Sequence, residues 1–295
     1  MFRGVGTALI TPFKDNGEID YKKYEALLEF QIQNEIDALI VLGTTGESPT
    51  ISIEERRELT KIAVKMSNGQ VPVIVGTGSN DTEKVLKLNK IAEEDGADGL
   101  LIVTPYYNKT NQAGLVKNYN YIAENTSLPI ILYNVPSRTG VNILPETAKE
   151  LSKIENIVAI KEASGDMSQV LKTINLCSSK MKVLSGNDDQ AFPLILSGGD
   201  GVISVFSNLA PKAMKQITTN IFENDYQKAR EIFYKYLNLM NLMFIDVNPI
   251  PIKFAMSKIG LSNNNLRKPL FKLSKEKEEL ILQEMRKLGM IWNTV

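Results

Sequence analysis

Eight short apolar segments, separated by longer amphipathic ones, are the feature of this sequence that most restricts its fold. They span residues 5–10, 38–42, 71–75, 99–103, 129–133, 157–160, 181–184 and 201–205. Most are rich in Val, Ile and Leu, which is typical of strands buried in a parallel sheet. Strands that alternate with helices predict βαβ units, and eight units predict an α/β fold, a (β/α)8 TIM barrel. An open doubly wound sheet is the alternative, but it usually needs fewer strands.

The alternation stops after the eighth apolar segment. From there to the end the sequence predicts successive helices, near residues 210–225, 226–243, 250–260 and 274–289. We therefore expect a C-terminal α-helical extension, with residues 1–224 as the catalytic barrel and residues 225–295 as a helical domain.

Composition excludes several functional classes. The 295 residues have zero formal net charge, so a surface for nucleic acid or for an anionic membrane is not indicated. No apolar run approaches the roughly 20 residues that span a bilayer. The N-terminal residues lack the charged leader and apolar core of a signal peptide, so we expect a cytoplasmic protein.

Two residue types restrict the chemistry. The sequence contains no histidine, which excludes Ser-His-Asp and Cys-His nucleophile pairs and His-ligated metal sites. Proton transfer must then use other side chains or water. The one cysteine, Cys177, excludes an intrachain disulfide; we interpret it as a packed or idle thiol, and an interchain disulfide in an oligomer is the alternative.

Lys161 follows the apolar run at 157–160, at the end of a predicted buried strand. An amine in apolar surroundings loses hydration, which disfavours its charged form. The free amine can attack a ketone to form a Schiff base. An ion pair with Glu162 or another carboxylate is the alternative interpretation of this lysine, and for a lysine alone it is the more common one.

The segments that follow the predicted strands favour the Schiff base. They read GTTGES at 43–48, TPYYN at 104–108, YNVPSRTG at 133–140, KEASG at 161–165, SGNDD at 185–189 and SVFSN at 204–208. In a (β/α)8 barrel the carboxyl ends of all strands meet at one face, where catalytic residues lie. Threonines, tyrosines, an arginine and a lysine are therefore expected to converge there.

Several of these side chains have a chemical role available to them. The segment 43–46 can offer backbone N–H and hydroxyl donors to a carboxylate at a helix N-terminus. Tyr133 can give and take a proton beside the lysine, and Arg138 can bind a carboxylate through two parallel hydrogen bonds. Taken singly, each also fits a structural role: a glycine turn, a packed tyrosine or a surface ion pair. Surface packing is likewise the alternative for Tyr106 and Tyr107.

Two further motifs do not extend the site. The glycine-rich segment 197–201 precedes the last strand, so it is expected at the opposite end of the barrel, and the loop 204–208 has no glycine nest or lysine. Both observations favour a substrate without phosphate. Asp188 and Asp189 could suggest a metal, but without histidine we interpret them as caps of the next helix.

Together these motifs resemble those of the dihydrodipicolinate synthase family, within the pyruvate-dependent class I aldolases. The resemblance also includes GVGTALITPF at the N-terminus, GVISV at 201–205 and NPIPIKFAM at 248–256, and it covers essentially the whole chain. It implies a lyase that condenses pyruvate with L-aspartate 4-semialdehyde to 4-hydroxy-tetrahydrodipicolinate, in the diaminopimelate route of lysine biosynthesis.

The resemblance also implies the site residues. The catalytic residues would be Lys161, Tyr133, Thr44 and Tyr107, and the substrate-binding residues would be Thr45, Arg138, Gly186 and the backbone of Ile203. The lysine would form the covalent intermediate, so neither a cofactor nor a metal would be required. Tyr107 would reach into the site of the adjacent subunit, which implies a homo-oligomer built as a dimer of dimers.

Other activities share this pattern in part. N-acetylneuraminate lyase and 2-keto-3-deoxy sugar acid aldolases have the same barrel, lysine and tyrosine. The segment 137–140, together with Thr44 and Thr45, suits a small charged aldehyde better than a polyhydroxylated sugar. A non-catalytic keto-acid-binding protein is another alternative, but the intact lysine, tyrosines and arginine argue against it.

Many members of the family are inhibited by lysine at a second site. The resemblance places its residues at Ser48, Asn80, Lys84 and Tyr106, beside Pro49. Lysine-sensitive bacterial relatives commonly have histidines at the positions of Ile53 and Arg56 and a glutamate at that of Lys84. Two of these three positions are cationic here, so we expect lysine to inhibit weakly or not at all, unless Glu83 compensates.

Overall fold

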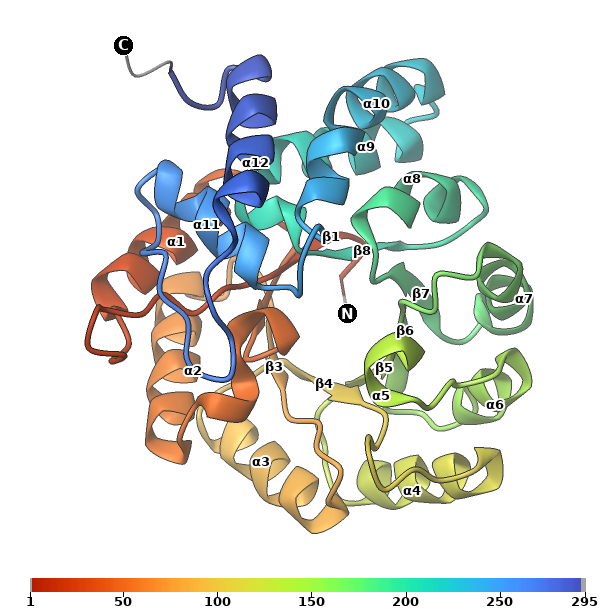
Figure 1. Cartoon of the computed structure of the whole chain (residues 1–295). Helices are drawn as coiled ribbons and strands as arrows, with labels where there is room; N and C mark the ends of the chain where they lie inside the picture. The colour runs from red at the N-terminus through yellow and green to blue at the C-terminus, as the bar shows by residue number, and fades with distance from the viewer. Residues whose placement is uncertain (1, 293–295) are drawn as a thin grey trace.

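Eight parallel strands form a closed barrel at the centre of the computed structural model, which describes residues 2–292 (Figure 1). The strands are β1 Gly4–Ala8, β2 Ala38–Val41, β3 Val73–Gly76, β4 Gly99–Val103, β5 Ile130–Asn134, β6 Ile157–Glu162, β7 Lys182–Ser185 and β8 Gly201–Ser204. Each strand pairs with the next along the chain, and β8 pairs with β1. The predicted (β/α)8 barrel is confirmed, and the open sheet is excluded.

At most of their ends, the observed strands begin or stop one or two residues away from the predicted positions. Strand β3 begins at Val73, whereas the sequence predicted a start at residue 71. Pro72 explains the difference, because proline has no N–H to donate to a neighbouring strand. Its carbonyl still accepts a hydrogen bond from the Leu39 N–H, so pairing with β2 begins there.

Side chains alternate between two apolar layers along each strand. On β6, Ala159 lies in the cluster inside the barrel, whereas Ile160 lies in the cluster between the strands and the surrounding helices. The same alternation puts Tyr133 of β5 inside the barrel. Because side chains two residues apart share a face, Lys161 is on the inner face and Glu162 is on the outer one.

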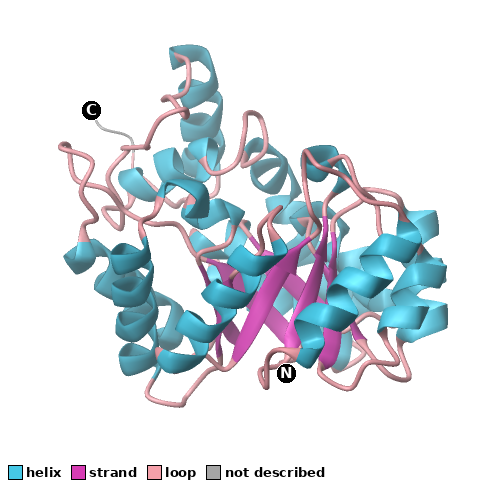
Figure 2. Cartoon of the chain, turned by 90° about the horizontal axis from the view of Figure 1, so that it is seen from below, coloured by secondary structure: helices cyan, strands magenta, loops and turns pink. Residues whose placement is uncertain are grey.

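Helices surround the barrel, and Figure 2 shows the strands enclosed by them. The barrel helices are α1 Tyr21–Gln33, α2 Ile53–Ser67, α3 Thr82–Glu94, α4 Gln112–Glu124, α6 Pro145–Leu151, α7 Met167–Cys177, α8 Asp188–Leu196 and α9 Pro211–Phe222; a short helix, α5 Pro136–Thr139, follows β5. Ser52 and Glu55 form a capping box at the start of α2, and Asp81 caps α3. Gly96, with a φ of 87°, follows the end of α3, where a left-handed glycine commonly ends a helix.

Three more helices complete the described chain: α10 Tyr226–Leu242, α11 Ile250–Lys258 and α12 Lys275–Lys287. Helix α10 packs on α8 and α9, and α12 packs on α10 and α11. The predicted C-terminal helical extension is confirmed; the domain boundary at 224/225 stays a prediction. Within residues 2–292, none of the helices has both the length and the apolar character required to cross a bilayer.

Candidate active site

A small cavity of about 160 Å³ lies at the carboxyl ends of the strands, and Lys161 is in its wall. The cavity brings together five of the predicted site residues: Thr45, Tyr133, Arg138, Lys161 and Gly186. They come from four different loops or strand ends, which the closed barrel brings to one face.

Lys161 and Tyr133 are neighbours across the β5–β6 pair, directly opposite each other in register. The Lys161 Nζ lies 4.2 Å from the centre of the Tyr133 ring, and the lysine is only 4% exposed. The inner faces of two adjacent strands therefore place an amine against an aromatic ring whose hydroxyl can exchange protons.

Glu162 does not pair with Lys161. Its carboxylate, on the outer face of β6, accepts hydrogen bonds from the side chains of Asn134 and Gln169 and from the Ser164 N–H. Among residues 2–292, Lys161 forms no ion pair with any carboxylate. The structural alternative for Lys161, an ion pair with its neighbour, is therefore wrong.

Gly186 packs closely against the lysine. A Cβ at this position would lie 2.6 Å from the Cβ of Ala163 and 3.1 Å from the Cε of Lys161. Any larger residue would push the lysine stem, so glycine gives the side chain the space to move towards a substrate.

Asn248 connects two predicted substrate-binding residues, and the sequence analysis assigned it no role. Its backbone carbonyl accepts a hydrogen bond of 3.1 Å from Arg138 Nη2, and its side-chain amide donates one of 3.0 Å to Thr45 Oγ1. The residue is buried, it lines the cavity, and its Oδ1 has no partner among the described residues. The motif NPIPIKFAM begins at Asn248 and was the available signal.

Three of the predicted site residues lie outside this cavity. Thr44 lines a larger neighbouring cavity, and Ile203 is fully buried inside the barrel. Tyr107 is 92% exposed on the β4–α4 loop and adopts a left-handed backbone conformation, with φ 69°. Because its side chain points to solvent in this single chain, it does not line the cavity of its own subunit.

The GTTG turn differs from the expected helix N-terminus. Residues Thr44–Gly46 form a separate short 3-10 turn, η1, and a second such turn, η2 Ser48–Thr50, comes before α2. The Gly46 N–H is bonded to the Gly43 carbonyl. The Gly46 N–H is therefore already engaged within the turn and is not available to a ligand.

Asp188 holds the loop after β8, and the prediction that it caps a helix is wrong. It lies in the first turn of α8, and its Oδ2 accepts hydrogen bonds from the N–H groups of Val205 (3.1 Å) and Phe206 (2.9 Å). Its carboxyl group is buried, and burial raises its pKa from 3.8 to about 6. Within residues 2–292, no group of three His, Cys, Asp or Glu residues is placed to hold a metal ion.

This pKa predicts a pH-dependent stability. The folded-state pKa of Asp188 is raised, so its favourable contribution is complete below about pH 4 and is lost as the pH rises through about 6. Asp188→Asn keeps an acceptor for both N–H groups and cannot ionise. Relative to this variant, the free energy of unfolding of the wild type should fall by up to about 3 kcal/mol between pH 4 and pH 7, measured by urea titration. Parallel pH curves would contradict the prediction.

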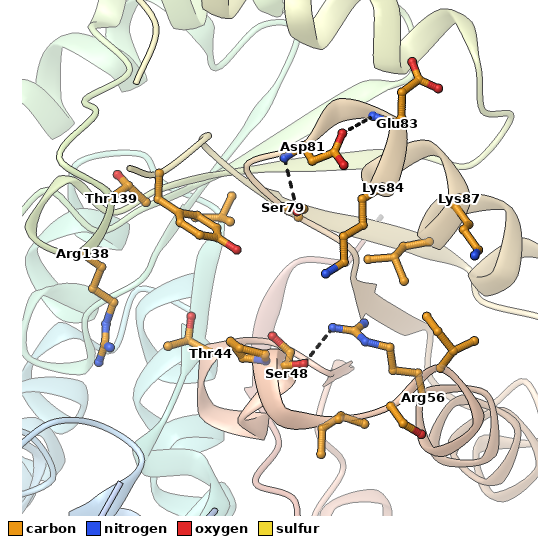
Figure 3. A pocket seen from close by; sticks show the side chains of 18 of the residues that line it. Thr44, Ser48, Arg56, Ser79, Asp81, Glu83, Lys84, Lys87, Arg138 and Thr139 are labelled. Atoms are coloured by element: carbon orange, nitrogen blue, oxygen red, sulfur yellow. Dashed lines mark hydrogen bonds between the residues drawn. The ribbon is translucent and has the colours of Figure 1, made fainter. Parts of the chain in front are cut away.

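A larger cavity, of about 740 Å³, lies beside the candidate active site (Figure 3). Its wall includes Ser48, Lys84 and Tyr106, three of the four residues predicted for a second site, and also Ile53 and Arg56. The fourth, Asn80, does not line it; the Asn80 carbonyl accepts a hydrogen bond from the Asn108 side chain.

Cys177 is fully buried at the end of α7, and burial raises the pKa of its thiol to about 11. The packing favours the inert, packed thiol over the interchain disulfide.

Comparison with known proteins gives the family. The model of the "Dihydrodipicolinate synthetase family" matches residues 1–287. A 4-hydroxy-tetrahydrodipicolinate synthase of Thermotoga neapolitana is 52% identical over 295 residues, covering 99% of this chain and 100% of its own. The solved dihydrodipicolinate synthase of Thermotoga maritima is 49% identical with a TM-score of 0.97, over 99% of this chain and 100% of that one. The solved enzyme of Acinetobacter baumannii, described as chloride inhibited and complexed with pyruvate, is 41% identical with a TM-score of 0.96, over 99% and 100% of the two chains. This chain therefore belongs to the dihydrodipicolinate synthetase family.

Proposed function

We propose that this protein is a 4-hydroxy-tetrahydrodipicolinate synthase, a lyase that condenses pyruvate with L-aspartate 4-semialdehyde in the diaminopimelate route of lysine biosynthesis. The observation that carries the proposal is the buried Lys161 amine, which is paired with no carboxylate of residues 2–292 and lies 4.2 Å from the Tyr133 ring, in a cavity that also contains Arg138. The likeness to the Thermotoga synthases and the pyruvate complex of the Acinetobacter enzyme support it.

The reaction requires a nucleophilic amine and side chains that transfer protons. The Lys161 amine attacks the ketone carbon of pyruvate, and loss of water gives an imine. Removal of a methyl proton gives an enamine, whose carbon attacks the aldehyde carbon while the aldehyde oxygen takes up a proton. The amino group of the second substrate then attacks the imine carbon and displaces Lys161. The ring that forms is the product, and one water is released for each turnover.

The predicted site residues, inside and outside the cavity, fit these steps. Tyr133 is placed to pass protons, with Thr44 and a neighbouring subunit's Tyr107 completing the relay. Thr45 and the Ile203 backbone would hold pyruvate, and Arg138 would bind the carboxylate of the semialdehyde. Because the lysine carries the substrate covalently, the reaction needs no cofactor and no metal.

The exposed Tyr107 supports a homo-oligomer. A tyrosine that is 92% exposed in one chain can enter the site of a second chain, and we infer a dimer as the minimal unit and a dimer of dimers as the assembly. We place the enzyme in the cytoplasm, with its small-molecule substrates.

A coupled assay with pyruvate and a panel of aldehydes tests this function. Aspartate semialdehyde should be used far more efficiently than a polyhydroxylated sugar aldehyde such as N-acetylmannosamine. A preference for the sugar would contradict the proposed second substrate but not the chemistry at Lys161.

Tyr133→Phe tests the relay. The variant keeps the ring beside Lys161 and removes the proton, so turnover should fall by about 10²-fold or more if general acid–base catalysis is lost. Steady-state kinetics at saturating concentrations of both substrates measure the effect. Turnover near that of the wild type would mean that Tyr133 has only a packing role.

Arg138→Ala tests selection of the second substrate. Removing a bidentate carboxylate contact should raise the KM for aspartate semialdehyde by about tenfold or more and change the KM for pyruvate much less. Arg138 also donates a hydrogen bond to the Asn248 carbonyl. Equal increases in both KM values would therefore assign Arg138 to holding the loop instead.

A further inference from the structure

Arg56 is the central cation of the large cavity between α2 and α3. Its guanidinium donates two hydrogen bonds of 3.1 Å, one to the Gly76 carbonyl and one to the Ser48 carbonyl. These fix its position, but neutral carbonyls leave its charge uncompensated. An arginine has five N–H donors, so three remain for another partner. Among residues 2–292, no carboxylate pairs with it, and burial lowers the pKa of the guanidinium to about 10.

Two lysines add positive charge to the same cavity. Lys84 and Lys87 are one turn apart on α3, and both line the cavity together with Arg56. Figure 3 shows the Lys84 amine and the Arg56 guanidinium pointing into the same space. In the described part of the chain neither lysine forms an ion pair with a carboxylate.

Two acids, Asp81 and Glu83, also line the cavity, but within residues 2–292 neither forms an ion pair with the three cations. Asp81 is the N-cap of α3, and its carboxylate accepts the Glu83 N–H. The Glu83 carboxylate points away from Lys84 and Arg56 in Figure 3. In the described chain Glu83 makes no ion pair with Lys84 or Arg56, so the three cations line the cavity without a directly bonded carboxylate.

We propose that this cavity binds a small oxyanion, a carboxylate or a phosphate, anchored by Arg56 and held by Lys84 and Lys87. Two carbonyls hold the guanidinium in place before the ligand arrives, so little side-chain entropy is lost on binding. The remaining donors fit the paired oxygens of a carboxylate or phosphate. A diammonium compound such as lysine would meet like charge in the same place. The proposal does not depend on the reaction at Lys161.

Because the cavity adjoins the candidate active site, an oxyanion bound in it can affect the activity of the enzyme. Val135 and Arg138 line both this cavity and the candidate active site, and Thr44 lines this one beside them. A bound oxyanion would change the electrostatic environment of Arg138, which is proposed to hold the second substrate. We therefore expect the oxyanion to raise the KM for aspartate semialdehyde.

Isothermal titration calorimetry on the full-length protein tests the binding. Inorganic phosphate and succinate are titrated separately at constant ionic strength, with sodium chloride and L-lysine as comparison ligands. We expect saturable binding of at least one of the two oxyanions and much weaker binding of lysine. Arg56→Gln and the double variant Lys84→Gln/Lys87→Gln should each weaken oxyanion binding by about tenfold or more.

Lys90→Gln is the matched control. Lys90 is an exposed lysine on the same helix, outside the cavity, so its variant should bind as the wild type does. The double lysine variant changes only exposed side chains and keeps the test valid if Arg56→Gln does not fold. Oxyanion binding that survives in the double variant, or binding of lysine tighter than that of succinate and phosphate, would overturn the assignment.

Discussion

Lys161→Ala is expected to reduce turnover by about 10⁴-fold or more, the scale of loss when a covalent nucleophile is removed. The reason is that no imine can form without the amine, and the enamine carbon that attacks the aldehyde then never arises. The melting temperature should not fall, because Lys161 forms no ion pair in the described chain that the variant would break. Turnover is measured in the coupled assay, and stability by thermal unfolding.

Lys161→Arg is the matched control for charge. It keeps a cation at the end of β6 but has no free amine, so it should be as inactive as the alanine variant. Substantial activity in Lys161→Arg would mean that Lys161 acts as a positive charge and not as a nucleophile, and the proposed mechanism would be wrong.

Lys253→Met is expected to lower the free energy of unfolding by about 3–5 kcal/mol, the usual cost of leaving a buried charge without its partner. The Lys253 Nζ lies 2.6 Å from Glu47 Oε1, and the two side chains are 0% and 2% exposed. Burial lowers the pKa of Lys253 to about 8, with the Glu47 charge opposing the shift. The variant leaves the Glu47 carboxylate buried, and among residues 2–292 its one remaining donor is the Arg267 N–H.

Two further variants isolate this buried pair. Glu47→Gln/Lys253→Met removes both charges and should recover most of the lost stability, because an uncharged replacement of a buried pair is often neutral. Lys14→Met breaks an exposed pair with Glu18, in which the lysine is 52% and the glutamate 64% exposed, and should leave the free energy of unfolding nearly unchanged. A double variant as unstable as Lys253→Met alone would show that the loss comes from packing instead of charge.

The buried pair also supports the candidate active site. Glu47 directly follows the turn η1, in a left-handed conformation with φ 55°, and Lys253 reaches it from α11. The pair therefore connects the C-terminal extension to the turn that carries Thr44 and Thr45. We expect Lys253→Met to reduce activity as well as stability.

The barrel and its catalytic face could be predicted from the sequence because both depend on local patterns. Apolar runs of four to six residues identify the strands, and the residues after each run must share one face in a closed barrel. The position of Lys161 beside Tyr133 follows from that arrangement, and the structure shows the two in register.

The contacts across long stretches of sequence could not be predicted in this way. Asn248 bridges Thr45 and Arg138 over more than 100 residues, and no local periodicity indicates such a bridge. Asp188 was misread for the same reason: an acid at the start of a helix is usually a cap, but its partners here are N–H groups 17 and 18 residues further on. The direction of a side chain could not be predicted from the sequence either: only the structure shows where the Glu83 carboxylate points.

Trapping with borohydride is the most direct test of the central claim, that Lys161 forms an imine with pyruvate. The protein is treated with sodium borohydride in the presence and absence of pyruvate, and its peptides are analysed by mass spectrometry. The proposed chemistry predicts a reduced secondary-amine adduct, Nε-(1-carboxyethyl)lysine, at Lys161 that requires pyruvate and is absent from Lys161→Ala. An unmodified Lys161, or an equal adduct in Lys161→Ala, would contradict it.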